Sequence, residues 1–469
     1  MHPLLALLVT VATAATEIHP IELRSMVEEI APVVEQVAGR PFLRLPPVVA
    51  TDEAQLEAVI FKEQVHLSMT QGLPAEAAEH HARVVAHEVA DSFAGKYGFL
   101  DKVLYVSVEG IAHRLAAQRA PAWLLRPMVR VVLAHELAHA LQDQHTDLAA
   151  MATRARGEDA VLAINCAVEG HAVWVHEAVA ARMGLSDALD VMTELLGTDR
   201  ALDPLLNPSA YHNTYVYGLG RDFVAFHVHH GGTEQVWKVL ERPPATTQQI
   251  ATPARWASRR SLSWPSTELR RAVRRLAPRK WMTDTRRMGD YEIRDQLLRA
   301  EASEVLADAL VDGWNARAIG AANQGLEVQH LRFESAETAT SFVVQMRIGA
   351  NRQVELLDGD PFVRATSGQL DCGEGWTTAR EGITVALFGD LGEDESSPQD
   401  KRNDQLGRLW VSDREHVLQV IFVNARVSDA RLCRVLRPLV HSLGSARNSS
   451  SRHGESTAGP LEFWQIDPQ

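Results

Sequence analysis

The stretch from Val131 to His145 constrains the fold of this chain more than any other part of it. It reads VVLAHELAHALQDQH, and neither Gly nor Pro occurs between Met128 and Thr146. Since most of its first positions are apolar and nothing interrupts it, the stretch predicts a buried helix. On such a helix His135 and His139 lie one turn apart on the same face.

This spacing is that of a zinc-binding helix. Two neutral imidazoles one turn apart can share a Zn²⁺ ion, and Glu136 beside them can act as a general base on a water molecule. In 469 residues with 20 His and 60 acidic residues, about 0.1 such matches arise by chance. The alternative is an amphipathic helix with surface or hydrogen-bonded core histidines. Because buried polar groups need partners, we predict a Zn²⁺ cofactor bound by His135 and His139.

A catalytic zinc site needs a third protein ligand, and Glu169 is the first candidate. Its neighbours on a predicted second helix are small or apolar, so a carboxylate there is costly unless it is paired or bound to a metal. Gly170 beside it allows two backbones to approach closely. His171 is the second candidate. We expect His176 and Glu177, two turns further on, on a polar face.

The residues that follow the motif suggest supporting roles. Asp143, one turn after His139, is placed to orient a ligating imidazole. His145 and Asp147 are expected to be capping or surface groups. Residues 148–158 are expected to form a loop between the two site helices.

Other segments suggest where a substrate is bound. Residues 97–106 predict a β-hairpin whose edge could bind an extended peptide by strand addition, or which is purely structural. Tyr217 is the first candidate to donate a hydrogen bond to a developing oxyanion, and Tyr215 is the second. The alternative for both tyrosines is a packing role with satisfied hydroxyl groups.

These residues resemble the gluzincin-type, thermolysin-like zinc metallopeptidases. The chain is also similar, over about residues 90–345, to a family of uncharacterised, predicted secreted bacterial proteins. Their hallmark, His-Glu-Leu-x-His-Ala-Leu-Gln-Asp-Gln-His, is present at His135–His145. It is followed by Glu169-Gly170, Tyr215-Val216-Tyr217-Gly218, Gly231-Gly232, Pro243–Ile250 and Gly313-Trp314. The resemblance implies a zincin-like peptidase domain. The sequence departs from the pattern at His171, where an acidic residue is expected, and at Ala251-Thr252, where His-Pro is expected.

The whole chain is expected to be α+β. We predict a mainly helical zincin-like metallopeptidase domain with a short β-hairpin or edge sheet, followed by a small α+β C-terminal domain. The predicted boundaries are a signal peptide at 1–14, the metallopeptidase domain at 17–250, a helical extension at 251–320, the small α+β domain at 321–444 and a disordered tail at 445–469.

Composition and charge limit the partners. The formal net charge of −13 argues against nucleic acid. No run after the N-terminus is long and apolar enough for a membrane span. The N-terminal apolar run ends in Ala-x-Ala and predicts a secretory signal peptide cleaved after Ala14, hence a secreted, periplasmic or cell-envelope protein. Cys372 and Cys433 could pair in an oxidising compartment.

The resulting hypothesis is a zinc-dependent metallopeptidase that hydrolyses peptide bonds in a peptide or protein substrate. Glu136 acts as its base, and His135, His139 and Glu169 hold the metal. The alternative is a catalytically inactive, zincin-like secreted binding or envelope protein. Nothing in the sequence defines a specificity pocket.

Overall fold

The computed structural model describes most of the chain. The described residues are 18–70, 72–90, 94–155, 157–196, 208–257, 266–276, 283–312, 318–322, 326–357, 363–372, 377–386, 403–423 and 428–445. The predicted signal peptide at 1–14 and all but the first residue of the predicted tail at 445–469 lie outside these ranges.

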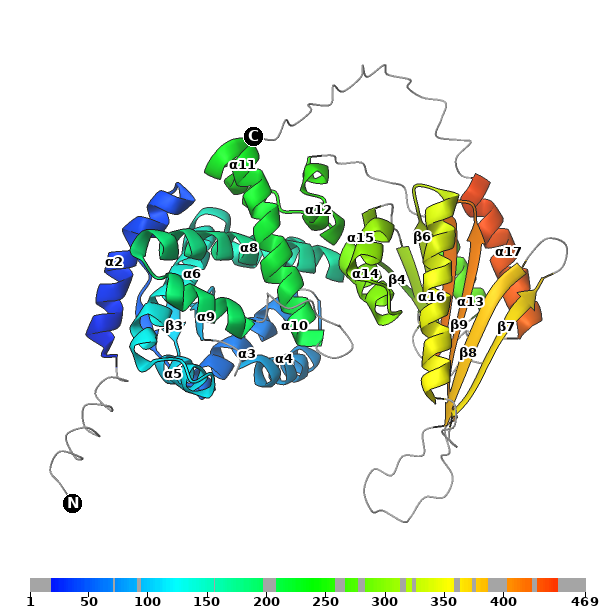
Figure 1. Ribbon diagram of the computed structural model, residues 1–469, viewed down its shortest axis with the longest axis horizontal. Coiled ribbons are helices and arrows are strands. Elements are labelled where there is room, and N and C mark those ends of the chain that lie inside the picture. Colours follow the sequence, from blue (N-terminus) through cyan, green and yellow to red (C-terminus); the bar gives the residue numbers. More distant parts are fainter. Residues whose placement is uncertain are drawn as a thin grey trace, which may run out of the picture. The chain divides into compact units, whose positions relative to one another are not determined.

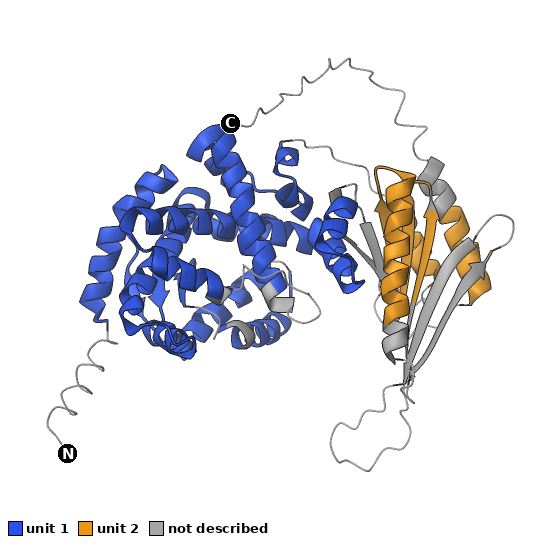
Figure 2. Cartoon of the chain, viewed as in Figure 1, with its two compact units in different colours: residues 1–262, 287–312 blue, residues 263–286, 313–469 orange. Residues whose placement is uncertain are grey.

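The chain divides into two compact units (Figure 2). Unit 1 comprises residues 1–262 and 287–312, and unit 2 comprises residues 263–286 and 313–469. Helices dominate unit 1 and a sheet flanked by helices dominates unit 2, which confirms the α+β class. The zincin-like fold and the domain boundaries given above stay predictions.

Unit 1 is mainly helical (Figure 1). Its helices are α2 (Pro20–Ala38), α3 (Glu53–Thr70), α4 (Ala75–Val89), α5 (Val108–Ala117), η2 (Ala122–Leu124), α6 (Leu125–Thr146), α7 (Leu148–Arg154), α8 (Glu158–Met183), α9 (Ser186–Leu196), α10 (Pro208–Asn213), η3 (Thr214–Leu219), α11 (Gly220–Glu241), α12 (Thr247–Ala251), η4 (Pro253–Trp256), α14 (Asp290–Arg299) and α15 (Glu304–Asp312). Its strands are β1 (Val48–Ala50), β2 (Gly95–Gly98) and β3 (Val103–Val106).

Helix α6 carries the motif and lies in the core of unit 1. Pro127 falls in its first turn, where a missing backbone N–H is tolerated. Leu133, Leu137 and Leu141 are fully buried, so the motif lies on a buried helix as predicted. The helix ends at Asp147, which adopts a left-handed conformation and donates its N–H to the carbonyl of Asp143.

Asp147 also begins the next helix. Its side chain accepts a hydrogen bond from the N–H of Ala150 and thereby caps α7. The prediction of a loop over 148–158 is therefore wrong, because α7 occupies Leu148–Arg154. The expected capping role of Asp147 is confirmed.

The predicted hairpin is present in unit 1. Strand β2 pairs antiparallel with β3, and β1 pairs parallel with β3 on its other side. The strand order β1-β3-β2 leaves β2 at one edge of this sheet. Contacts of α6 with β2 and β3 bring that edge strand next to the motif helix.

Unit 2 is built on a seven-stranded sheet of order β4-β5-β6-β10-β9-β8-β7. Its elements are α13 (Ser266–Leu276), β4 (Thr283–Arg287), β5 (Ala318–Ala322), β6 (Leu326–Arg332), α16 (Ala336–Leu357), β7 (Val363–Asp371), β8 (Thr377–Ala386), β9 (Asn403–Asp413), β10 (His416–Val423) and α17 (Asp429–Ser445). Val328 shares a buried cluster with α13 and α17, whereas Phe333 contacts Phe342 of α16. Since alternate strand residues face opposite sides, α16 covers the other face of the sheet (Figure 1).

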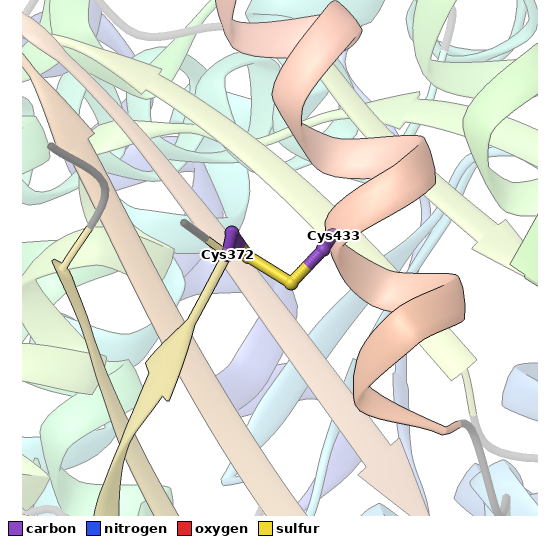
Figure 3. Close-up of a disulfide and its surroundings, with 2 residues drawn as sticks. All are labelled: Cys372 and Cys433. Atoms are coloured by element: carbon purple, nitrogen blue, oxygen red, sulfur yellow. A yellow bond between two sulfur atoms is a disulfide. The ribbon is translucent and has the colours of Figure 1, made fainter. Parts of the chain in front are cut away.

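In unit 2 one expected element differs, and the two cysteines that were expected to be able to pair are bonded. The sequence pattern of residues 353–357 predicts a strand, but these residues continue α16. Cys372 and Cys433 form a disulfide with a Cα–Cα distance of 5.3 Å (Figure 3). This bond joins the segment just after β7 to α17. Over the described residues, every helix is too short or too polar to cross a bilayer.

Candidate metal centre

Two histidines of α6 and one glutamate of α8 come together in unit 1. The Nε2 atoms of His135 and His139 lie 3.1 Å apart. Glu169 Oε2 lies 3.2 Å from the Nε2 of His135 and 3.3 Å from that of His139. Within the described part of the chain, these three residues form the group of His and acidic side chains that could hold a metal ion. We call these three side chains the metal group.

The spacing of the donor atoms fits a small tetrahedral cation. Ligand atoms about 2.1 Å from a tetrahedral zinc ion lie about 3.4 Å from one another, and the observed separations are 3.1 to 3.3 Å. The side chains of His135, His139 and Glu169 keep 10%, 12% and 26% of their surface exposed. Three protein ligands with solvent access are typical of catalytic rather than structural sites.

Electrostatics favour a cation between these side chains. Burial alone would raise the pKa of Glu169, but His139 and His135 hold that pKa well below its ordinary range. Burial also opposes protonation of His139, yet the charge of Glu169 outweighs it and raises the pKa of His139 to about 9. A partly buried carboxylate between two imidazoles is therefore stabilised by a positive charge, which a proton or a metal ion can supply.

A further histidine of α8, His176, contacts the imidazole of His135 on the side away from Glu169. His176 is 2% exposed, and its Nδ1 lies 3.0 Å from the Nδ1 of His135. The prediction that His176 lies on a polar face is therefore wrong. Its spacing of seven residues from Glu169, about two helical turns, was the signal that places both on one face. Burial holds the pKa of His176 well below its ordinary value.

The second candidate ligand, His171, does not belong to the group of three. It is 1% exposed, and its Nδ1 accepts a hydrogen bond from Gln142 Nε2 at 3.0 Å. Burial lowers the pKa of His171 to about 3. Glu177 forms an ion pair of 3.5 Å with an arginine of α11, consistent with its expected polar face.

The predicted general base, Glu136, lies beside the group. Its Oε2 accepts a hydrogen bond of 2.5 Å from the backbone N–H of Tyr97 in the edge strand β2. The preceding residue, Lys96, forms an ion pair of 2.8 Å with Glu63 of α3. Burial would lower the pKa of Lys96, but Glu63, Glu136 and Glu169 together raise it. A fixed positive charge therefore lies near the carboxylate of the base.

Gln142, rather than Asp143, contacts a metal-facing imidazole. Gln142 Oε1 lies 2.9 Å from His139 Nδ1, and its Nε2 donates to the carbonyl of Val168 at 2.8 Å. Asp143 instead accepts hydrogen bonds from Tyr97 Oη at 2.7 Å and Lys102 Nζ at 2.5 Å. The prediction for Asp143 is therefore wrong, and its carboxylate holds the hairpin to α6.

The last two residues of the motif, Gln144 and His145, bind the segment 41–44. Gln144 Oε1 accepts hydrogen bonds from the N–H groups of Leu43 and Arg44, and Gln144 Nε2 donates to the carbonyl of Arg44. His145 Nε2 donates to the carbonyl of Pro41 at 2.9 Å. The eleven residues from His135 to His145 thus face a metal group, a hairpin and the segment 41–44.

The two candidate tyrosines have different environments. Tyr217 lies in the π-helical turn η3, and its ring centroid is 6.4 Å from that of His135. The charge of Glu169, together with burial, raises the pKa of Tyr217 well above its ordinary value, so its phenol remains a donor. Tyr215 Oη donates instead to Asp290 Oδ1 at 3.0 Å. The second candidate is therefore wrong, because its hydroxyl serves a different network.

That network joins the start of α8 to α12 and α14. Thr247 donates from both its N–H and its Oγ1 to Asp159 Oδ1, at 3.0 and 2.6 Å. Burial raises the pKa of Asp290, which accepts from Tyr215, to about 7. Thr247 lies in the Pro243–Ile250 segment, whose role here is to anchor the beginning of the helix that carries Glu169.

Gly170 sets how closely α8 and α11 cross. A Cβ atom at this position would lie 2.1 Å from the carbonyl carbon of Gly220. A Cβ at Gly220 would lie 2.3 Å from the carbonyl oxygen of Cys166. Only glycine at both positions allows this close crossing. The crossing fixes the position of α8 at Glu169, the residue just before Gly170.

Comparisons with known proteins give one structural neighbour. No protein-family model and no curated protein sequence matches the chain, so the gluzincin resemblance stays a prediction. A solved structure described as "a putative hydrolase with a novel fold", from Chloroflexus aurantiacus, is similar at 19% identity with a TM-score of 0.38. The match covers 51% of this chain and 89% of the neighbour. The assignment of the site rests on its own geometry.

Proposed function

We propose that this chain is a zinc-dependent metallopeptidase of the gluzincin type, with a zincin-like arrangement in unit 1. One observation carries the proposal: three donor atoms 3.1 to 3.3 Å apart, drawn from two helices. Their separations suit zinc, and a carboxylate lies next to them on α6. Nitrogen and oxygen donors of this kind are those of catalytic zinc sites.

In the proposed mechanism the protein supplies a base and an oxyanion donor. A zinc ion held by His135, His139 and Glu169 would supply Lewis acidity and would make the attacking water more acidic. Glu136 takes the proton of the attacking water and passes it to the leaving amine. Tyr217 donates a hydrogen bond to the carbonyl oxygen as negative charge develops on it. The Tyr97 N–H holds Glu136 in place for the first transfer.

We propose a peptide or protein substrate that reaches the site beside β2, the edge strand next to Glu136. The outward N–H groups of Tyr97 and Phe99 are already donated to Glu136 and Glu63, so this edge positions the base instead of pairing with the substrate as a further strand.

We also propose that the protein works in an oxidising compartment, after secretion or export. The disulfide between Cys372 and Cys433 supports this, because structural disulfides persist mainly outside the reducing cytosol. Fractionation of the source cells, with detection of the mature N-terminus, tests the proposal. An unprocessed protein confined to the cytosol would contradict it.

The decisive test of the activity is Glu136→Gln. This variant keeps the shape of the side chain but removes the base, so we expect one zinc per chain and a rate of peptide cleavage reduced about 10²- to 10⁴-fold. Zinc content is measured by elemental analysis and cleavage with a peptide library. Glu28→Gln, the same chemical change at an exposed position on α2, is the matched control and should keep the parent rate.

The alternative function has its own signature. A parent chain that binds zinc but cleaves no peptide in the library supports an inactive binding or envelope protein. Parental cleavage by Glu136→Gln would show that Glu136 is not the base.

A further inference from the structure

Both metal-facing imidazoles contact a second, buried layer of side chains. His135 Nδ1 faces His176 Nδ1 at 3.0 Å, and His139 Nδ1 faces Gln142 Oε1 at 2.9 Å. In each case the Nε2 atom points toward the metal group and the Nδ1 atom points away from it. The second layer therefore controls which nitrogen of each ring carries the proton.

The hydrogen positions in the His176 arm follow from the contacts. When Nε2 of His135 gives its lone pair to a cation, its Nδ1 carries the hydrogen and donates it. His176 Nδ1 must then accept, so His176 carries its own hydrogen on Nε2. A protonated imidazolium has no acceptor atom, so His176 is neutral in this arrangement.

The Gln142 arm reaches the same result by a longer path. The carbonyl oxygen of Gln142 accepts from His139 Nδ1, which leaves the amide hydrogens to be donated elsewhere. They go to the carbonyl of Val168 at 2.8 Å and to the Nδ1 of His171 at 3.0 Å. The backbone carbonyl can only accept, so it fixes the orientation of the amide. His171, as the second acceptor, is neutral as well.

We propose that His176 and the Gln142–His171 pair are positioning residues that hold His135 and His139 in their metal-binding tautomers without adding negative charge. This inference rests on the proposed metal site, although it does not require that the site cleave peptides. Ligating histidines usually donate to a carboxylate, a backbone carbonyl or water, and a carboxylate makes the ring a more basic ligand. The acceptors His176 and Gln142 are neutral. Among the contacts described, Glu169 is therefore the one anionic side chain that directly contacts the rings of His135 and His139.

The first test removes or restores the acceptor at position 176. His176→Ala leaves His135 Nδ1 without its acceptor, so we expect about 10- to 100-fold weaker zinc binding. His176→Asn places an amide oxygen close to the position of Nδ1 and should restore most of the affinity. Zinc affinity is measured by competition with a chromophoric chelator, and the absorption of the cobalt-loaded protein reports the ligand geometry.

A matched control separates this role from general destabilisation. His227 is 4% exposed, lies on α11 and contacts the rings of Phe223 and Trp256 rather than the metal group. His227→Ala removes a comparable buried imidazole and should leave the zinc affinity unchanged. If His227→Ala lowers the affinity as much as His176→Ala, the specific role of His176 is refuted.

The charge part of the proposal is tested by His176→Asp against His176→Asn. The two side chains have nearly the same shape and differ by one negative charge. We expect the aspartate variant to bind zinc more tightly, because a carboxylate acceptor raises the basicity of His135. Equal affinities would overturn the claim that neutrality matters.

Failure of the inference and failure of the proposed function give different results. Parental zinc affinity in His176→Ala would overturn the inference and leave the peptidase proposal intact. The expected affinity changes in a chain that cleaves no peptide would support the inference and refute the peptidase proposal. A parent chain that binds zinc no better than His135→Ala would overturn both.

Discussion

The contact between Gly170 and Gly220 predicts a large effect of a one-carbon change, Gly170→Ala. The added Cβ would lie 2.1 Å from the carbonyl carbon of Gly220 and 2.7 Å from the nitrogen of Arg221. Carbon atoms in contact are about 3.5 Å apart. The shortfall of roughly 1.4 Å, which is 3.5 minus 2.1, falls on backbone atoms, so α8 and α11 must separate.

A separation of this size is larger than a zinc site tolerates. Ligand distances in such sites vary by about 0.2 Å, and Glu169 immediately precedes Gly170 on the helix that must move. We therefore expect zinc affinity to fall about 100-fold, the upper end of the losses caused by disturbed ligand support. The free energy of unfolding of the metal-free protein should fall by about 1–3 kcal/mol, as for other overpacked sites.

The assay is zinc competition combined with thermal unfolding of the metal-free protein. Gly218→Ala is the control, since its Cβ would meet only Thr214 Cγ2, at an ordinary contact distance of 3.9 Å. It lies in η3, two residues before Gly220, and should keep the parent affinity. Parental zinc affinity in Gly170→Ala would refute the reasoning that this crossing positions Glu169.

Three further predictions address other parts of the chain. In Asp290→Asn, the pH dependence of stability should flatten. Burial raises the pKa of Asp290 from 3.8 to about 7, so the folded state retains a proton that the unfolded state loses, and stability falls as pH rises through this window. Urea unfolding of parent and variant at several pH values checks this, and parallel curves would contradict it. Asp143→Asn should lower the free energy of unfolding by about 1–3 kcal/mol because it weakens the bonds to Tyr97 and Lys102. Its zinc affinity should stay at the parent value, and a large loss would restore a role for Asp143 in orienting the imidazoles. Cys372→Ser opens a loop of 61 residues and should destabilise unit 2 by about 4 kcal/mol in denaturant unfolding. The parent protein in reductant should match the variant, and a difference between them would mean that the serine itself disturbs the fold.

The central geometry could be predicted because it is local or strongly constrained by burial. His135 and His139 are neighbours on any helix, whatever the rest of the fold. Glu169 stood out because a carboxylate among small and apolar neighbours requires a partner. The hairpin at β2 and β3 was also predictable, since short apolar runs flank a turn at residues 100–102.

The remaining site residues depend on contacts between distant segments. Whether Gln142 or Asp143 faces the metal group is set by where β2 and α8 pack around α6, which spacing along one helix does not specify. Tyr215 and Tyr217 likewise differ only in which helix meets each side of the π-helical turn. The strand expected over 353–357 was wrong because its short alternating pattern also fits the end of a long helix.

Side chains of α6 contact three separate parts of unit 1: the second layer on α8, the hairpin of β2 and β3, and the segment 41–44. These contacts depend on the spacing of the residues along α6. Each residue added to or deleted from a helix rotates all following side chains by about 100° and shifts them by about 1.5 Å. A single insertion between His139 and Gln142 would turn Gln142, Asp143 and Gln144 away from the second layer, the hairpin and the segment 41–44 together. Single side chains in this segment can be substituted without moving their neighbours, whereas an insertion or deletion would disrupt all three sets of contacts at once.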